Sequence, residues 1–173
     1  MTTESMNANE KLRFDRLTFY AEDMEQIDKL LGEFLRLSGA KCALLVDKDG
    51  HLVTKRGEVR TIDMDTISAL VAGSFAATKE MARLLGEEEF SALFHQGERD
   101  NIQLSLVGER TLLTILFDER TTVGMVRLYA SETAKKLATI YGDAMNRQDE
   151  QGAPTLDEDY GDDAKRKLEN LFE

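Results

Sequence analysis

The chain has 173 residues, with 22 Lys and Arg against 33 Asp and Glu, which gives a net charge of −11 at pH 7. This length suits one domain with a tail. An acidic chain gains little from phosphate groups, so nucleic acids and anionic membranes are not expected partners. One cysteine, Cys42, and two histidines cannot form a disulfide framework or a standard zinc site.

Targeting and membrane signals are not expected from the apolar pattern. The first residues contain no apolar run of the kind found in signal peptides. The longest apolar stretches, residues 43–46 and 112–117, are far shorter than a membrane-spanning helix. We therefore expect a cytoplasmic protein that does not insert into membranes.

Charge and proline content divide the chain into three parts. Residues 1–20 form an N-terminal extension, residues 21–147 a domain, and residues 148–173 an acidic tail. The stretch 147–155 is polar and contains the single proline, Pro154, which is typical of a linker.

A short amphipathic helix is predicted near the end of the tail, over residues 162–172. It would place four apolar residues on one face: Ala164, Leu168, Leu171 and Phe172. This face is too small to fold alone. The tail is therefore either disordered or docks its helix on a partner.

The domain opens with a helix, then two strands, then a second helix. Apolar residues recur at helical spacing from Met24 to Leu37, and Gly39 follows as a stop. Residues 41–46 and 51–55 are predicted strands joined by a hairpin turn at 47–50. The second helix is predicted from an N-cap at Asp63, with Gly86 as its C′ residue. Its expected apolar side consists of Met64, Ile67, Val71, Phe75, Thr78, Ala82 and Leu85.

The second half is predicted to hold three strands and a last helix. The charged connector 87–100, with Phe90, Leu93 and Phe94, is expected to form one or two helical turns. Strands are predicted at 101–107, 110–117 and 122–129, with a two-residue turn at Gly108 and Glu109. Ser131 is the expected cap of the last helix. Strands joined by short turns pair antiparallel, so the order α-β-β-α-β-β-β-α predicts an α+β fold with a five-stranded antiparallel sheet flanked by helices.

Candidate catalytic and metal sites are weak. The turn at 47–50 begins like a calcium-binding loop, but its later positions lack the required ligands, which favours a plain hairpin turn. His95, Glu98 and Arg99 could serve acid–base chemistry only inside a pocket, and a loop histidine bonded to backbone is the simpler interpretation. Cys42 is expected to be a small buried residue. We predict no enzyme, no metal and no cofactor.

The second helix carries four small residues, Ala72, Gly73, Ala76 and Ala77. A glycine inside a helix costs about 1 kcal/mol relative to alanine, so close approach of another element is expected there. That element is either the chain's own sheet or the same helix of a second copy. Strand 101–107 alternates Ile102, Leu104 and Leu106 with polar residues. If this strand lies at the sheet edge, dimerisation would cover its unpaired backbone, so both features favour a homodimer.

Several segments resemble the bacterial Roadblock family. They are LLVDKDG at 44–50, LVAGSFAA at 70–77, LLGE at 84–87, FHQGE at 94–98, residues 117–128 and the terminal LENLF at 168–172. The resemblance implies a Roadblock/profilin-like fold and a homodimer with the second helices antiparallel and the sheets joined through 101–107. It also implies that the dimer binds one small Ras-like GTPase of the MglA type, in a two-to-one complex, and stimulates GTP hydrolysis by remodelling its switch regions. The implied setting is cell polarity or gliding motility, with enrichment at a cell pole.

We place the GTPase-binding surface on the second helix and the tail. The residues expected there are Ser74, Lys79, Glu80, Arg83, Leu168, Leu171 and Phe172. Arg99, Arg110 and Arg120 do not sit in obvious finger loops, although Arg99 is the better candidate for a direct charge on the GTPase. Two alternatives remain open: a scaffold dimer that does not activate its GTPase, and a small hydrolase that uses His95 and Glu98.

Overall fold

The computed structural model of the protein describes residues 21–58 and 61–150, apart from the side chains of residues 148 and 149. The chain divides into two compact units. The boundary between them lies between Gly142 and Asp143, within the last described helix. The fold described below is that of the first unit.

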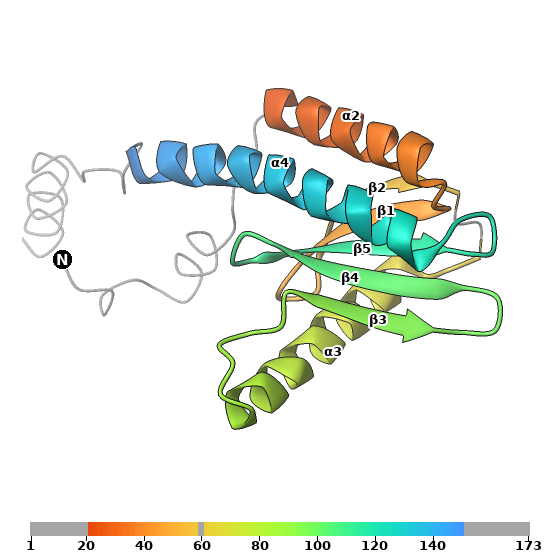
Figure 1. The fold of residues 1–173 in the computed structure, drawn as a ribbon. Helices are drawn as coiled ribbons and strands as arrows, with labels where there is room; N and C mark the ends of the chain where they lie inside the picture. Colours follow the sequence, from red (N-terminus) through yellow and green to blue (C-terminus); the bar gives the residue numbers. More distant parts are fainter. Residues whose placement is uncertain (1–20, 59–60, 151–173) are drawn as a thin grey trace, which may run out of the picture. The chain divides into compact units, whose positions relative to one another are not determined.

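The described elements are a five-stranded sheet and three helices. They are α2 (Ala21–Ser38), β1 (Cys42–Asp47), β2 (Leu52–Gly57), α3 (Met64–Leu84), β3 (Ala92–Gln96), β4 (Asn101–Val107), β5 (Thr111–Phe117) and α4 (Val123–Glu150). The strand order is β2-β1-β5-β4-β3, and every neighbouring pair is antiparallel. Helices α2 and α4 cover one face of the sheet and α3 covers the other (Figure 1). The predicted α+β architecture is confirmed.

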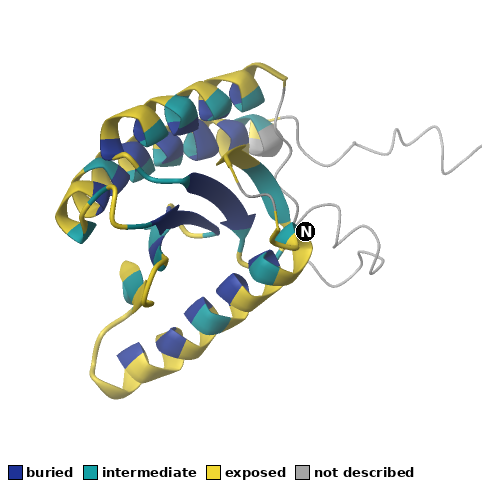
Figure 2. Cartoon of the chain, turned by 90° about the vertical axis from the view of Figure 1, so that its right-hand side faces the viewer, coloured by how far each residue is buried: buried dark blue, intermediate teal, exposed yellow. Residues whose placement is uncertain are grey.

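The centre of the sheet forms the core. All seven residues of β5 are buried, and all residues of β1 except the last, Asp47, are buried (Figure 2). Because side chains alternate along a strand, β5 contributes buried side chains to the core on both faces of the sheet. Leu112 packs beneath α3 with Val71, Phe75 and Leu104. Leu113, its neighbour along the chain, is completely buried as well.

Both ends of α3 confirm the predicted caps. The Asp63 carboxylate accepts hydrogen bonds from the backbone N–H groups of Asp65 and Thr66, at 3.1 and 3.2 Å. At the other end, Gly86 has φ +80° and its N–H donates to the Arg83 carbonyl. The N–H of Glu87 donates to the Ala82 carbonyl, which completes a Schellman motif.

The predicted strand at 122–129 is wrong, because this segment begins α4. The Thr122 hydroxyl accepts from the Met125 N–H at 3.3 Å and so caps the helix. Buried residues then follow at helical spacing, at Val126, Ala130, Thr133 and Leu137. Ser131 is therefore an exposed residue within α4 rather than its cap.

The predicted helical turns in the connector 87–100 are also wrong, because Ala92–Gln96 forms strand β3. Leu93 packs against the cluster beneath α3, whereas Phe94 stacks on Phe117 with ring centroids 6.0 Å apart. Consecutive apolar residues on opposite faces are a strand pattern. The sheet therefore keeps five strands, with β3 in place of the segment 122–129.

Strand β4 does not lie at the edge of the sheet. It pairs with β5 on one side and β3 on the other, so the outer strands of the described sheet are β2 and β3. The prediction that two sheets join through residues 101–107 therefore fails, because the backbone of β4 is already paired. The turn after β4 spans residues 108–110, one residue more than predicted.

Helix α4 continues through Glu150, so the first residues of the predicted linker 147–155 are helical. Residues 1–20 and the predicted tail helix at 162–172 lie outside the described residues. Among the residues that the structure describes, none of the helices combines the length and apolar character needed to cross a membrane.

Candidate interaction surface on helix α3

Helix α3 has two apolar sides. One side packs on the sheet and includes Val71 and Phe75. The other faces outward and carries three large exposed residues: Leu70 is 67% exposed, Met81 53% and Leu84 79%. Leu85, expected on the packed side, is 73% exposed just beyond the helix.

The outward residues form a continuous line along α3. Positions 70, 73, 77, 81 and 84 fall on one helical face, with the exposed small residues Gly73 and Ala77 between the large ones. We call these five residues the α3 stripe. It extends over about 21 Å at 1.5 Å per residue. Figure 2 shows exposed colouring along this side of the helix. A continuous exposed apolar surface is characteristic of a protein contact.

Gly73 distinguishes between the two explanations offered for the small residues. A Cβ atom built at Gly73 meets nothing within 4 Å. The packing among the described residues therefore does not require glycine at this position, and nothing in that part of the chain compensates the helical cost of glycine. Gly73, Ala76 and Ala77 are exposed as an intermolecular contact needs, whereas Ala72 is 7% exposed and belongs to the chain's own core.

The polar residues predicted to contact a GTPase also lie on α3. Lys79, Glu80 and Arg83 are exposed and Ser74 is half-buried. The Arg83 Nη2 atom lies 3.1 Å from Glu80 Oε2, and Lys79 Nζ lies 3.9 Å from Glu89 Oε1. Such exposed ion pairs contribute little to stability. Leu168, Leu171 and Phe172 lie outside the described residues.

The predicted interface residues of strand 101–107 face α3. Leu104 is 1% exposed, and Ile102 and Leu106 pack partly buried against the same cluster. They contribute to the core beneath α3, and a direct part in a dimer contact stays a prediction. The strand with the open edge next to them is β3, which pairs only with β4 among the described strands.

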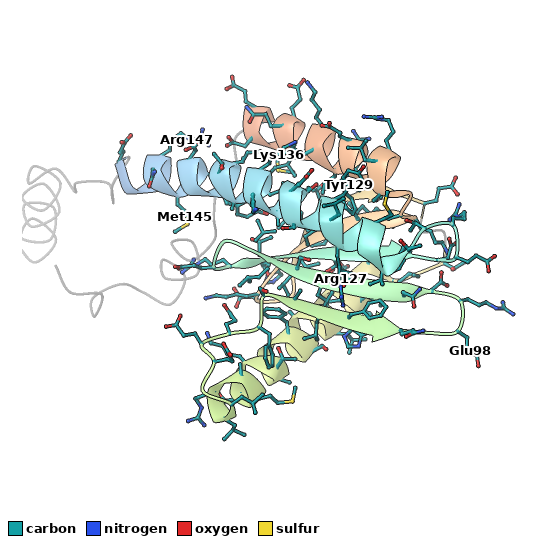
Figure 3. All side chains as sticks on the ribbon, viewed as in Figure 1. Glu98, Arg127, Tyr129, Lys136, Met145 and Arg147 are labelled. Carbon is teal, nitrogen blue, oxygen red and sulfur yellow. The ribbon has the colours of Figure 1, made fainter. Side chains whose placement is uncertain are left out.

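His95, Glu98 and Arg99 do not form a catalytic pocket. His95 lies in strand β3 rather than in a loop, and all three side chains are exposed. Glu98 extends away from the sheet at the turn after β3 (Figure 3). Acid–base chemistry needs groups held beside a substrate, and the described residues do not provide that arrangement here.

The turn at 47–50 is a hairpin turn, as predicted. The Asp47 carboxylate accepts from the N–H groups of Asp49 and His51, at 3.0 and 2.8 Å, and so closes the turn. Gly50 has φ +91° and lies against Ala69 of α3, where a Cβ atom would meet Ala69 Cα at 3.0 Å.

No cluster of His, Cys, Asp or Glu able to hold a metal ion occurs among the described residues.

Cys42 is fully buried in β1, as predicted. Burial raises the pKa of its thiol to about 11, although the positive charge of Lys55 acts in the opposite direction. The thiol therefore stays protonated at neutral pH, which makes it a weak nucleophile.

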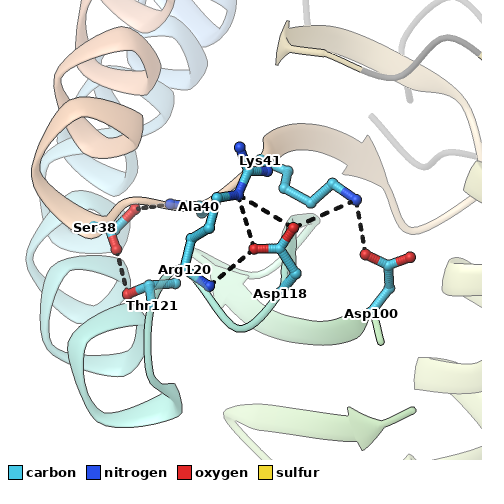
Figure 4. Close-up of polar contacts among 7 residues, drawn as sticks. All are labelled: Ser38, Ala40, Lys41, Asp100, Asp118, Arg120 and Thr121. Carbon is cyan, nitrogen blue, oxygen red and sulfur yellow. Dashed lines mark hydrogen bonds and ion pairs between the residues drawn. The ribbon is translucent and has the colours of Figure 1, made fainter. Parts of the chain in front are cut away.

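Arg120 belongs to a cluster of polar side chains at one end of the sheet (Figure 4). Lys41 Nζ contacts Asp100 Oδ1 at 2.8 Å, and Arg120 Nε contacts Asp118 Oδ1 at 2.9 Å. The hydrogen bonds from Arg120 hold the pKa of the Asp118 carboxyl below its usual value. Arg120 is thus bound to its own loop. Of the other candidate finger residues, Arg99 is exposed in a turn and Arg110 is half-buried.

Comparison with known proteins agrees with this architecture. The sequence pattern of the Roadblock/LC7 domain matches residues 26–117, just over half of the 173 residues. A solved structure described as MglB with a tetrameric arrangement is 37% identical, covers 74% of this chain and 96% of its own, and superposes with a TM-score of 0.71.

Two further solved structures come from named organisms. The gliding protein MglB of Thermus thermophilus is 36% identical over 73% of this chain and 96% of its own, with a TM-score of 0.70. MglB of Myxococcus xanthus is 35% identical over 68% of this chain and 96% of its own, with a TM-score of 0.66. The chain therefore belongs to the Roadblock/LC7 family, and within it the chain resembles MglB.

Proposed function

We propose that the protein is a homodimeric regulator of a small Ras-like GTPase of the MglA type, and that it stimulates GTP hydrolysis without being an enzyme itself. The α3 stripe is the observation that carries this proposal. It supplies a surface for a second copy on the helix that also bears the polar residues expected to meet the GTPase. The similarity to MglB supports the assignment of the partner.

The dimer contact is proposed to form by antiparallel packing of two α3 helices. Burial of Leu70, Met81 and Leu84 would remove the largest exposed apolar side chains of the helix from water, and Gly73 would let the two backbones approach closely. The open edge of β3 is the better candidate for joining the sheets, since β4 is already paired on both sides.

The GTPase is proposed to bind across the two-fold axis. Glu80 and Arg83 lie on the exposed side of α3, so a dimer formed through α3 would bring two copies of these residues onto one surface. One GTPase placed on the axis would block the symmetry-related position. This geometry supports one GTPase for each pair of chains.

Stimulation is proposed to come from the conformation of the GTPase rather than from an inserted arginine. A regulator shifts its partner's conformational equilibrium only by binding one state better than the other. A dimer surface that prefers the switch regions in their hydrolysis-competent form would order the attacking water. The binding of Arg120 to Asp118 supports this mechanism over an arginine finger at that position.

The test is single-turnover GTP hydrolysis by an MglA-type GTPase, measured with and without the full-length protein. We expect acceleration of tenfold or more and a complex whose mass corresponds to two chains and one GTPase. Binding without acceleration would instead support the alternative, a scaffold or adaptor dimer. A His95→Ala variant should stimulate as the parent does, whereas loss of stimulation would revive a chemical role for His95.

The tail is proposed as a second, separate contact with the GTPase. Replacing Leu171 and Phe172 together by alanine should weaken the association without unfolding the domain. Leu168 belongs to the same predicted apolar face. If affinity and stimulation both stay unchanged in the double variant, the tail contact is wrong while the α3 contact remains open.

A further inference from the structure

A groove lies between α4 and the β3–β4 hairpin, on the face of the sheet opposite α3. Its volume is about 470 Å³. The floor includes Phe94 of β3 and Gln103 of β4, and one wall comes from Ser131, Ala134 and Ala138 of α4. Gln103 pairs opposite Phe94 in the sheet, so both side chains point to this face.

Gln103 is an unusual residue for the floor of this groove. Its side chain is 1% exposed, and its Nε2 group donates to the Leu104 carbonyl at 3.2 Å. No group among the described residues donates a hydrogen bond to its Oε1 atom. A buried acceptor left without a partner costs free energy, so its presence next to an open groove points to a donor that arrives with a ligand.

The charge of the groove is opposite to that of the chain. Among the described residues that line the groove, the two charged ones, Arg127 and Lys135, are both basic, although the whole chain carries a net charge of −11. Arg127 extends from α4 toward the sheet (Figure 3), and its Cζ atom lies 5.6 Å from the centroid of the Phe94 ring. The ring is also stacked on Phe117, so it holds the guanidinium in place over the groove.

We propose that this groove binds an acidic, amphipathic peptide segment of a partner protein. A carboxylate of the segment pairs with Arg127 or Lys135, an apolar side chain packs on Phe94 and the alanines of α4, and an N–H group donates to Gln103 Oε1. The volume fits two or three anchoring side chains rather than a folded domain. The complementary charge of the lining favours an acidic segment over a basic or neutral one.

The groove and the α3 stripe share no residue and lie on opposite faces of the sheet. Leu104 packs in the cluster beneath α3, whereas Gln103 and Phe94 line the groove. Leu93 packs against that cluster and also contributes to the groove lining at the edge of the sheet. A dimer contact confined to the α3 stripe leaves the groove uncovered, whereas sheets joined at β3 would bring the second copy beside the groove. The protein could accept a peptide segment whether or not it acts on a GTPase, so the two proposals can fail separately.

The test begins with a displayed library of random 12-residue peptides selected on the full-length protein. We expect the enriched peptides to combine Asp or Glu with Leu, Phe or another large apolar residue. Enrichment of basic or uncharged peptides, or no enrichment at all, would overturn the proposal.

Neighbouring lysines on α4 then provide a matched pair of variants. Lys135 lines the groove, whereas the exposed Lys136 does not. Fluorescence polarisation with the enriched peptides should show at least a tenfold loss of affinity for Lys135→Glu and Arg127→Glu, and none for Lys136→Glu. Equal affinity for all four proteins would place the peptides elsewhere and reject the groove as their site.

Gln103→Leu addresses the unpartnered amide directly. Leucine removes the buried acceptor, so the variant should fold at least as stably as the parent while binding the enriched peptides about tenfold more weakly. A purely structural glutamine would give the reverse, with lower stability in urea and unchanged peptide affinity. Either part of that reverse pattern would contradict the role proposed for Gln103.

Discussion

The two faces of the sheet are covered unequally. Helices α2 and α4 cover one face, whereas α3 alone covers the other (Figure 1). Exposed large apolar residues also occur on these two helices, at Leu37 of α2 and at Met125, Leu128 and Met145 of α4. On α4, the exposed charged residues Glu132, Lys135 and Lys136 separate Leu128 from Met145, so no continuous line forms. On α3 the exposed apolar residues follow one another along the helix. The face covered by a single helix therefore carries the surface suited to a second copy of the chain.

The largest expected effect on stability concerns the face of the sheet that α2 and α4 cover. Leu113→Ala should destabilise the protein by about 3–5 kcal/mol, because Leu113 is 0% exposed and its removal leaves a cavity in close-packed surroundings. Urea denaturation measures the free energy of unfolding. A loss below about 1 kcal/mol would mean that this face is loosely packed and that the two faces differ less than their helices indicate.

The α3 stripe predicts the next effect, on assembly rather than on folding. Ala77→Arg should prevent the proposed dimer from forming, because a charged side chain would enter the centre of the proposed apolar contact. Light scattering measures the mass in solution. The matched control is Leu128→Arg on α4, a residue that is 54% exposed. An unchanged dimer mass in Ala77→Arg, or a monomer in Leu128→Arg, would contradict the distinction between the two helices.

The cap of α3 predicts a smaller effect that depends on pH. Hydrogen bonds from the Thr66 hydroxyl and from backbone N–H groups hold the pKa of Asp63 below its usual value. The ionised carboxylate therefore stabilises the folded state above the pKa of the unfolded chain, and this contribution is lost as the pH falls through the lowered pKa. Asp63→Ala should be less stable than the parent at neutral pH, and the difference should narrow in acid.

Asp63→Asn is the control for that prediction. Asparagine keeps a capping acceptor but carries no charge, so the charge-dependent part of the stability should be missing while the cap itself is retained. Denaturant melts at neutral and strongly acidic pH separate the two parts. A constant difference between Asp63→Ala and the parent across this range would show that the charge of Asp63 contributes nothing.

The smallest expected effect on folding belongs to the exposed pair on α3. Arg83→Ala should change the free energy of unfolding by less than about 0.5 kcal/mol, because its side chain is 73% exposed and its ion pair with Glu80 is open to solvent. The same variant should weaken binding of the GTPase. Parent-like affinity in a GTPase titration would remove Arg83 from the proposed surface.

Local signals were sufficient to predict α3. Asp63 and Gly86 mark its ends through hydrogen bonds to residues within a few positions, so the pattern of residue types carries the necessary information. The beginning of α4 was predicted wrongly because Thr122, Val123 and Val126 favour strands. The burial of Val126, Ala130 and Leu137 at helical spacing outweighs that preference.

The edge of the sheet could not be predicted from local signals. Strand order depends on which segments pair across the sheet. Because β4 pairs with β5 on one side and with β3 on the other, β3 rather than β4 forms the edge. The candidate surface was predicted in part, through Gly73 and Ala77. Leu70, Met81 and Leu84 were missed because the apolar positions of an amphipathic helix were assigned to one side, although these three lie on a second side of the same helix.

The burial of Cys42 makes the protein a convenient host for distance measurements. Its only thiol is enclosed in the sheet and protonated at neutral pH, so it reacts poorly with labelling reagents. A spin label would therefore attach almost exclusively to a second cysteine introduced at an exposed position. A single label on α3 cannot interact with a second label inside one chain. Any dipolar distance recorded from such a sample would therefore run from one copy to another and would measure the spacing within the proposed dimer directly.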